Sequence, residues 1–78
     1  MKNVQVLGSG CKRCRTVEEM VRVEAARLGV AIEVEKVTDM AAIARLGAMS
    51  TPGIVIDGKL VHAGGLPQAD DLARWLAA

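Results

Sequence analysis

Apolar residues in the first half of the chain follow two periodicities in turn. Residues 4–7 form a short run that is apolar except at Gln5 and includes the β-branched Val4 and Val6. This predicts a buried strand, and glycines at positions 8 and 10 end it. Residues 11–28 then predict a helix, because apolar side chains recur at intervals of three and four, with Gly29 where a C-terminal cap belongs. The apolar stripe of this helix comprises Cys14, Val17, Met20, Val21, Ala25 and Leu28.

The middle of the chain predicts one strand and one short helix. Residues 32–35 alternate between apolar and polar side chains, as in a strand with one exposed face. Thr38 or Asp39 can cap a second helix that runs to about residue 46. Residues 47–53 contain Pro52 and predict a loop.

The last third of the chain predicts a hairpin and a helix. Two short runs, the apolar residues 54–56 and the sequence Leu60-Val61-His62, flank Asp57-Gly58, and Asp-Gly at this spacing is a strong hairpin signal. Pro67 is expected to open the final helix, with Asp70 and Asp71 in its first turn, where the helix dipole favours negative charge.

The predicted order of elements is β-α-β-α-β-β-α. A strand–helix–strand unit favours a parallel pair with a right-handed crossover, whereas the hairpin must be antiparallel. The fold class is therefore α/β: a four-stranded mixed sheet with helices on both faces. At 78 residues the chain is expected to form one domain, residues 1–78.

Composition and charge exclude several classes of function. The net charge is +1 with both signs interspersed, and Trp75 is the only aromatic residue, which argues against nucleic-acid binding. No apolar run approaches the roughly 20 residues of a membrane-spanning helix, so no membrane partner is expected. The start of the sequence lacks the apolar stretch of a signal peptide, and we expect a cytoplasmic location.

The candidate chemistry is a Cys-x-x-Cys pair, Cys11 and Cys14, where the first strand meets the first helix. Unpaired N–H groups and the dipole at a helix N-terminus favour a thiolate, and Lys12 and Arg13 add positive charge that lowers the pKa of the pair. We expect Cys11 to be the exposed nucleophile. Cys14, on the apolar stripe, is expected to be the buried resolving thiol, and the pair then catalyses thiol–disulfide exchange.

Two other readings of the cysteine pair stay open. Two cysteines and one histidine are too few for a closed zinc or iron–sulfur site, so no resident metal and no other cofactor is expected. A two-coordinate soft-metal module, for example for Cu(I), remains an alternative function. A partner-binding adaptor that uses the pair only to sense redox conditions is a third. His62 is expected to be structural or solvent-facing.

Taken together, the motifs resemble the thioredoxin-like superfamily over nearly the whole chain, most closely the small redox-active disulfide proteins, also called glutaredoxin-like thioredoxins. The matching residues are Gly10, Cys11, Cys14, Thr51, Pro52, Gly53, Asp57, Gly58, Gly64 and Gly65. The resemblance implies that Pro52 is a cis-proline facing the cysteines. It also implies that Thr51, Pro52 and Gly10 contact substrate, with Thr51 pairing to substrate backbone.

The resemblance also implies the partners: disulfide-containing proteins or small disulfides as substrates, and a thiol reductant or a thioredoxin reductase-type donor. The sequence departs from the thioredoxin pattern at the cysteines, where Gly10 replaces a Trp and Lys12-Arg13 replaces Gly-Pro. No carboxylate is expected beneath Cys14 to accept its proton, and no set of residues for glutathione is evident.

Overall fold

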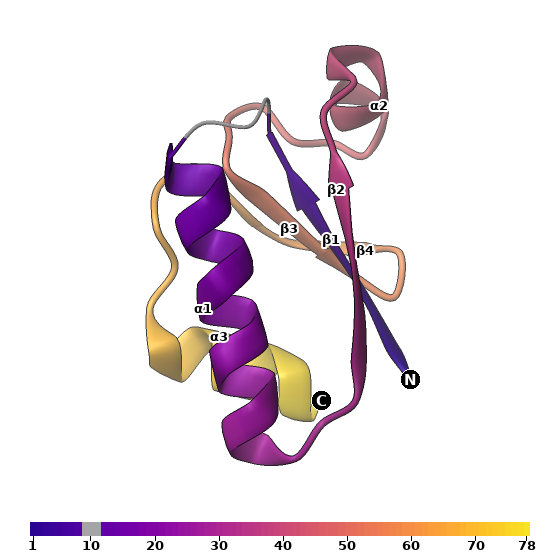
Figure 1. Cartoon of the computed structure of the whole chain (residues 1–78). Coiled ribbons are helices and arrows are strands. Elements are labelled where there is room, and N and C mark those ends of the chain that lie inside the picture. Colours follow the sequence, from indigo (N-terminus) through magenta and orange to yellow (C-terminus); the bar gives the residue numbers. More distant parts are fainter. Residues whose placement is uncertain (9–11) are drawn as a thin grey trace.

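A computed structural model describes residues 1–8 and 12–78 (Figure 1). The elements follow the predicted order: β1 (Lys2–Leu7), α1 (Lys12–Leu28), β2 (Ile32–Val37), α2 (Met40–Arg45), β3 (Gly53–Ile56), β4 (Lys59–Ala63) and α3 (Ala69–Ala77). The predicted α/β fold class is thereby confirmed.

The four strands form one mixed sheet in the order β2-β1-β3-β4. β1 and β2 are parallel, as expected for two strands joined through a helix, whereas β3 is antiparallel to both β1 and β4. The β3–β4 hairpin turns at Asp57 and Gly58, whose φ angles are 50° and 82°. Two successive positive φ values are what a two-residue type I′ turn requires, which explains the Asp-Gly pair.

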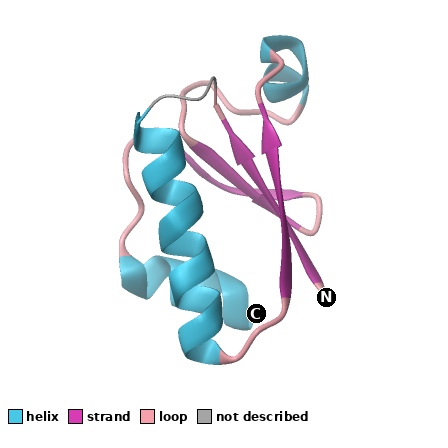
Figure 2. Ribbon diagram, viewed as in Figure 1, coloured by secondary structure: helices cyan, strands magenta, loops and turns pink. Residues whose placement is uncertain are grey.

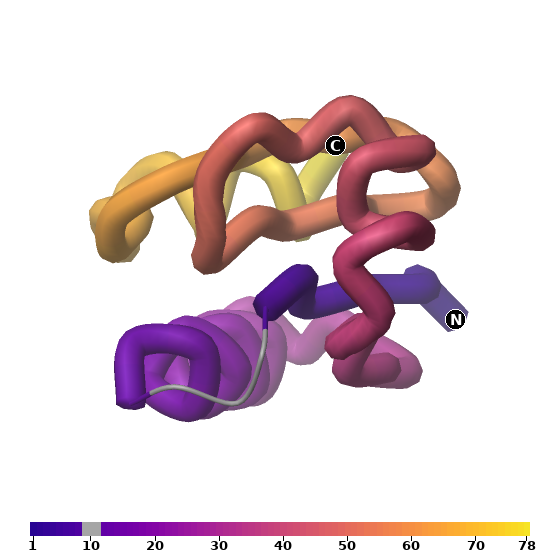
Figure 3. Tube along the Cα trace, turned by 90° about the horizontal axis from the view of Figure 1, so that it is seen from above, coloured from indigo at the N-terminus to yellow at the C-terminus, as the bar shows by residue number. Residues whose placement is uncertain are grey.

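Helices cover both faces of the sheet, as predicted. α1 and α3 lie on one face of the sheet (Figure 2), and α2 lies on the other face, as the view from above in Figure 3 shows. Successive residues of a strand point to opposite faces, so β1 sends Val4 and Val6 toward α1 and α3 but Leu7 toward α2. The sheet therefore has two separate apolar clusters.

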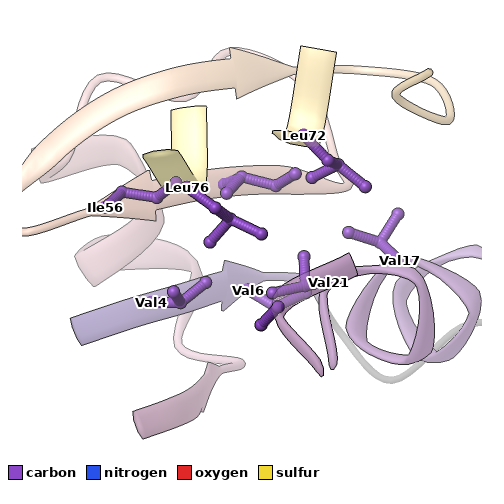
Figure 4. Close-up of a cluster of buried hydrophobic side chains, with 9 residues drawn as sticks. Val4, Val6, Val17, Val21, Ile56, Leu72 and Leu76 are labelled. Atoms are coloured by element: carbon purple, nitrogen blue, oxygen red, sulfur yellow. The ribbon is translucent and has the colours of Figure 1, made fainter. Parts of the chain in front are cut away.

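The first cluster, here called the large-face cluster, joins β1 and β3 to α1 and α3 (Figure 4). Its buried members are Val4, Val6, Val17, Val21, Ala25, Ile54, Ile56, Leu72 and Leu76. The second, the small-face cluster, consists of Leu7, Ile43, Ala48 and Val55, with α2 as its cover. The stripe predicted for α1 thus packs as expected, with its Met20 and Leu28 only partly buried.

Several predicted boundaries move. The prediction that Pro67 opens the last helix was wrong, because α3 begins at Ala69. The extended residue Gln68 is at the N-cap position, and its C=O accepts a hydrogen bond from Leu72 N–H at 3.1 Å. Asp70 and Asp71 do lie in the first turn. Asp39, rather than Thr38, caps α2, because its carboxylate accepts from Ala41 N–H at 3.2 Å.

β4 and α3 meet through two rings. The ring centroids of His62 and Trp75 are 5.8 Å apart, and Trp75 packs partly buried against the large-face cluster. His62 is half-buried, with Nε2 3.0 Å from the carbonyl oxygen of Gly65. These contacts give His62 a structural position, as expected.

Candidate functional site

Three segments converge at one end of the molecule. The C-terminal end of β1, the N-terminal end of α1 and the loop that precedes β3 all lie at the top of Figure 1, while both chain termini lie toward the other end. Parallel pairing carries β2 to the same end, where Val37 C=O accepts a hydrogen bond from Gly8 N–H at 2.9 Å. Cys14 lies in the first turn of α1, so the fold brings residues from all of these segments beside it.

Cys14 lies in the first turn of α1 with only 6% of its surface exposed. It continues the stripe of Val17 and Val21, and its sulfur is turned back toward the end of β1. A Cβ added to Gly8 would overlap Cys14 Sγ and would come within 3.3 Å of Cys14 Cβ. The strand can therefore approach the sulfur this closely only because residue 8 has no side chain.

The loop before β3 reaches the same place. The added Cβ on Gly8 would also lie 3.8 Å from Thr51 Cβ, so Thr51 and Cys14 both lie beside Gly8. The Thr51–Pro52 peptide bond is cis, the geometry that the resemblance implies, and Pro52 is buried with its C=O accepting from Gly64 N–H at 2.8 Å. Within the described residues, no hydrogen bond of the chain uses the backbone N–H or C=O of half-buried Thr51.

A small pocket opens beside Cys14. Its lining residues are Val6, Gly8, Cys14, Arg15, Lys36 and Thr38. About 20 Å³ is accessible to the centre of a water molecule, which is room for roughly one water. A space of this size cannot hold a metabolite, but it can connect the Cys14 sulfur with solvent.

The charges around this pocket are arranged across α1 and β2. Lys36 Nζ lies 3.2 Å from one carboxylate oxygen of Glu18, and an Arg22 guanidinium nitrogen lies 3.0 Å from the other. The hydrogen bond from Arg22 and the nearby Lys36 hold the pKa of Glu18 below its ordinary value, although partial burial opposes them. Among the described residues, no carboxylate lines the pocket itself.

Of the predicted site residues, Cys14, Thr51 and Pro52 come together. Lys12 and Arg13 are exposed on the first turn of α1. Cys11 and Gly10 lie outside the described residues, and with them the predicted start of the helix at residue 11.

Sequence reasoning missed Gly8 and Lys36. A glycine directly after a buried strand is a signal for close approach of another group, which applies to Gly8. Lys36 pairs with Val6 in the register of β1 and β2, and the sequence offered no sign of that register.

Within residues 1–8 and 12–78, no three His, Cys, Asp or Glu side chains are grouped so that they could hold a metal ion. No helix in the same part of the chain is both long enough and apolar enough to cross a membrane.

A four-stranded mixed sheet, with a cysteine at the start of its first helix facing a Thr-Pro turn, defines the thioredoxin-like class of proteins. A family model described as a thioredoxin domain matches residues 2–77. The chain belongs to this family. Membership gives it the general role of a thiol–disulfide oxidoreductase, with disulfide substrates and a reductase as its general classes of partner.

Two archaeal proteins illustrate the relationship. Thioredoxin of Methanothermobacter thermautotrophicus is 30% identical over 77 residues, which cover 99% of this chain and 100% of that protein. Thioredoxin of Methanocaldococcus jannaschii is 32% identical over 73 residues, covering 94% of this chain and 84% of that protein. The similarity therefore extends over the whole fold and is not confined to the cysteine motif.

Proposed function

We propose that this chain is a dithiol–disulfide oxidoreductase that uses Cys11 and Cys14 as its redox couple, with no other cofactor. The observation that supports it best is the position of Cys14. Its buried sulfur lies against Gly8, with Thr51 also beside that glycine, at the end of the molecule where α1 begins.

The reaction has two exchanges. The Cys11 thiolate attacks one sulfur of a substrate disulfide, which forms a Cys11–substrate disulfide and releases the other substrate sulfur as a thiolate that takes up a proton. The Cys14 thiolate then attacks Cys11, which forms the Cys11–Cys14 disulfide and releases the second substrate thiolate. The substrate gains two electrons, and a dithiol donor must reduce the pair before the next cycle.

Each remaining site residue has a role in this proposal. Lys12 and Arg13, exposed on the first turn of α1, keep positive charge near Cys11 and favour its thiolate. The backbone groups of Thr51 pair with an extended substrate segment, and Pro52 and Gly10 provide its contact surface. The support for Thr51 is that its backbone N–H and C=O are not used by the described part of the chain.

The substrates we propose are protein or small-molecule disulfides, and the donor is a thiol reductant or a thioredoxin reductase-type enzyme. The cytoplasm stays the predicted location, where such a donor would keep the pair reduced.

Reduction of insulin disulfides with dithiothreitol as donor tests this proposal. The wild-type protein should accelerate insulin precipitation above the rate with dithiothreitol alone, and Cys11→Ser should lose this acceleration. Cys14→Ser should instead accumulate a mixed disulfide with insulin, visible by mass spectrometry without reductant. Turnover by Cys14→Ser at the wild-type rate contradicts the assignment of the resolving thiol.

A titration of the reduced protein with Cu(I) separates the alternative function. One-to-one binding that competes with a strong Cu(I) chelator, combined with no insulin turnover, would favour the soft-metal module over the enzyme. Turnover in the presence of a metal chelator supports the oxidoreductase.

A further inference from the structure

An irregularity in β4 decides where the side chain of His62 points. Two successive residues of β3 lie opposite Leu60 and His62, so Val61 is an extra residue in β4 and forms a β-bulge. Leu60 packs in the small-face cluster, whereas Val61 packs against the large-face cluster. In a regular strand His62 would point to the same face as Leu60. The bulge instead turns His62 toward Trp75 of α3, as bulges beside functional sites re-aim a side chain.

From this position His62 reaches the turn that follows β4. Its Nε2 lies 3.0 Å from the carbonyl oxygen of Gly65. A carbonyl oxygen can only accept a hydrogen bond, so Nε2 must carry the proton and His62 is the donor. The donor is itself held at two places, because the backbone of His62 pairs with fully buried Ile54 and its ring lies beside Trp75.

The turn consists of Gly64 and Gly65, here called the glycine turn. Their φ angles are 84° and 69°, a region that glycine enters at no steric cost. Glycine also keeps more conformational freedom than other residues, so such a turn is fixed mainly by the contacts it makes. In the described chain Gly64 N–H donates to Pro52 C=O at 2.8 Å, and Gly65 C=O accepts from His62. The glycine turn therefore links His62 to the loop before β3.

The glycine turn touches that loop on both sides of Thr51. It bonds to Pro52 C=O, and a Cβ added to Gly64 would lie 3.0 Å from Ser50 Oγ. The backbone N–H and C=O of Thr51 are the groups that the proposed function offers to an extended substrate segment. Hydrogen bonds weaken steeply when their angle is poor, so Thr51 can pair well only if its two neighbours are held in place.

We propose that His62 is a positioning residue for the binding of polypeptide disulfides. Its hydrogen bond fixes the glycine turn, and the turn holds the chain on both sides of Thr51. The inference rests on the proposed oxidoreductase function. Because His62 acts through the loop that carries Thr51, it affects the binding of substrates that have a peptide backbone beside the disulfide and leaves the exchange at sulfur unchanged.

Two variants separate the hydrogen bond of His62 from its ring. His62→Phe keeps an aromatic ring beside Trp75 but has no donor, whereas His62→Gln loses the ring and keeps an N–H at a similar reach. With insulin as substrate and dithiothreitol as donor, His62→Phe should raise KM about three- to tenfold at unchanged kcat, as the loss of one hydrogen bond that supports binding predicts. His62→Gln should keep the KM of the wild type. An unchanged KM in His62→Phe, or an equal rise in His62→Gln, overturns the role of the hydrogen bond.

A substrate without peptide groups provides the control. Bis(2-hydroxyethyl) disulfide cannot pair with the backbone of Thr51, so it should oxidise reduced His62→Phe and the reduced wild type at the same rate. Alkylation of the remaining thiols and mass spectrometry measure this rate. If His62→Phe slowed the reactions with both disulfides equally, the variant would have damaged the cysteine centre, and the proposed role would be wrong.

Amide hydrogen exchange tests the same link without turnover. In His62→Phe the Gly64 N–H should exchange about three- to tenfold faster, because the turn that presents it to Pro52 has lost one hydrogen bond. The Asp57 N–H, bonded to Asn3 C=O at the other end of β3, should exchange as in the wild type.

The two proposals can therefore fail separately. Insulin reduction by the wild type, with Gly64 exchange unchanged in His62→Phe, overturns the inference alone. Faster Gly64 exchange with no insulin reduction by the wild type supports the link made by His62 and overturns the proposed function.

Discussion

The two faces of the sheet differ in how much apolar packing supports the site. The large-face cluster has nine buried members among the described residues, and α1, which carries Cys14, packs into it through Val17 and Val21. The small-face cluster has four, and the loop that leads to Thr51 follows α2, its only helical cover in the described chain. A segment with few buried apolar contacts has low local stability.

The site is therefore assembled from two halves. The large-face cluster supports the half on α1 strongly, and the small-face cluster supports the half with Thr51 weakly. In the proposed function, the half with Cys14 must keep its sulfur aligned for attack, which dense packing of α1 favours. In the same proposal, the half with Thr51 must receive substrates of different sequence, which lighter packing favours. The predictions below test this difference, beginning with the largest expected effect.

The largest loss of stability should come from truncating the large-face cluster. Leu72 is fully buried, and Leu72→Ala should lower the free energy of unfolding by about 4 kcal/mol. Ile43 is 2% exposed on the small face, and Ile43→Ala should cost about 2 kcal/mol because fewer partners surround the space it leaves. Urea denaturation followed by circular dichroism measures both, and equal losses would remove the distinction between the faces.

A methyl group on Gly8 should have the next largest effect. Gly8→Ala forces Cys14 or β1 to move, which should cost about 1–3 kcal/mol and displace the sulfur from its position for attack. Insulin turnover should therefore fall more than stability alone explains.

Gly53→Ala is the matched control for this prediction. Its new Cβ would meet Leu7 Cδ1 at 3.2 Å and His62 O at 3.3 Å, contacts that small shifts can relieve. Gly53→Ala should keep more of the activity than Gly8→Ala, as measured by insulin reduction and urea denaturation. Full activity in Gly8→Ala would contradict the geometry of the site.

The smallest effect should be a loss of stability in acid. Glu24 accepts hydrogen bonds from Arg27 that hold its pKa below the ordinary 4.5, and the hydrogen bond from Arg22 likewise lowers the pKa of Glu18. A depressed folded-state pKa stabilises the protein above 4.5, and this contribution disappears as pH falls from 4.5 through the lower folded-state value.

Urea denaturation at neutral pH and at about pH 3.5 checks this prediction. Glu24→Gln should flatten the pH dependence slightly, because the arginine partners of both pairs are more than half exposed and ion pairs open to solvent contribute little. Glu33→Gln, an exposed glutamate of β2, is the control and should leave the pH dependence as it is. A variant Glu24→Gln that lost stability equally at both pH values would show that its charge plays no part.

The fold could be predicted from sequence because its signals are local. The stripe of Val17, Val21 and Ala25 and the Asp57-Gly58 turn each specify one element through contacts between near neighbours in the chain. The start of α3 was misplaced because Pro67 has the φ angle of a first helical residue, yet Gln68 still takes an extended conformation before the helix begins.

The site was less predictable because its contacts are distant in sequence. Cys14 and Thr51 are adjacent to Gly8 only once β1 and the loop before β3 are placed side by side by the sheet. Lys36 looks like one more exposed charge of an alternating strand, and its neighbours Glu18 and Val6 follow from strand register and helix orientation. Neither can be deduced from the spacing of residues along the chain.

The single aromatic residue gives the protein a built-in optical probe. With no Tyr or Phe in the sequence, emission excited in the near ultraviolet comes from Trp75 alone. Its indole sits between His62 and the packed face shared by α1 and α3, so a change in its spectrum reports on that interface without any attached dye. Comparing the emission of the reduced and oxidised protein would reveal whether closing the cysteine pair changes the surroundings of Trp75 on α3.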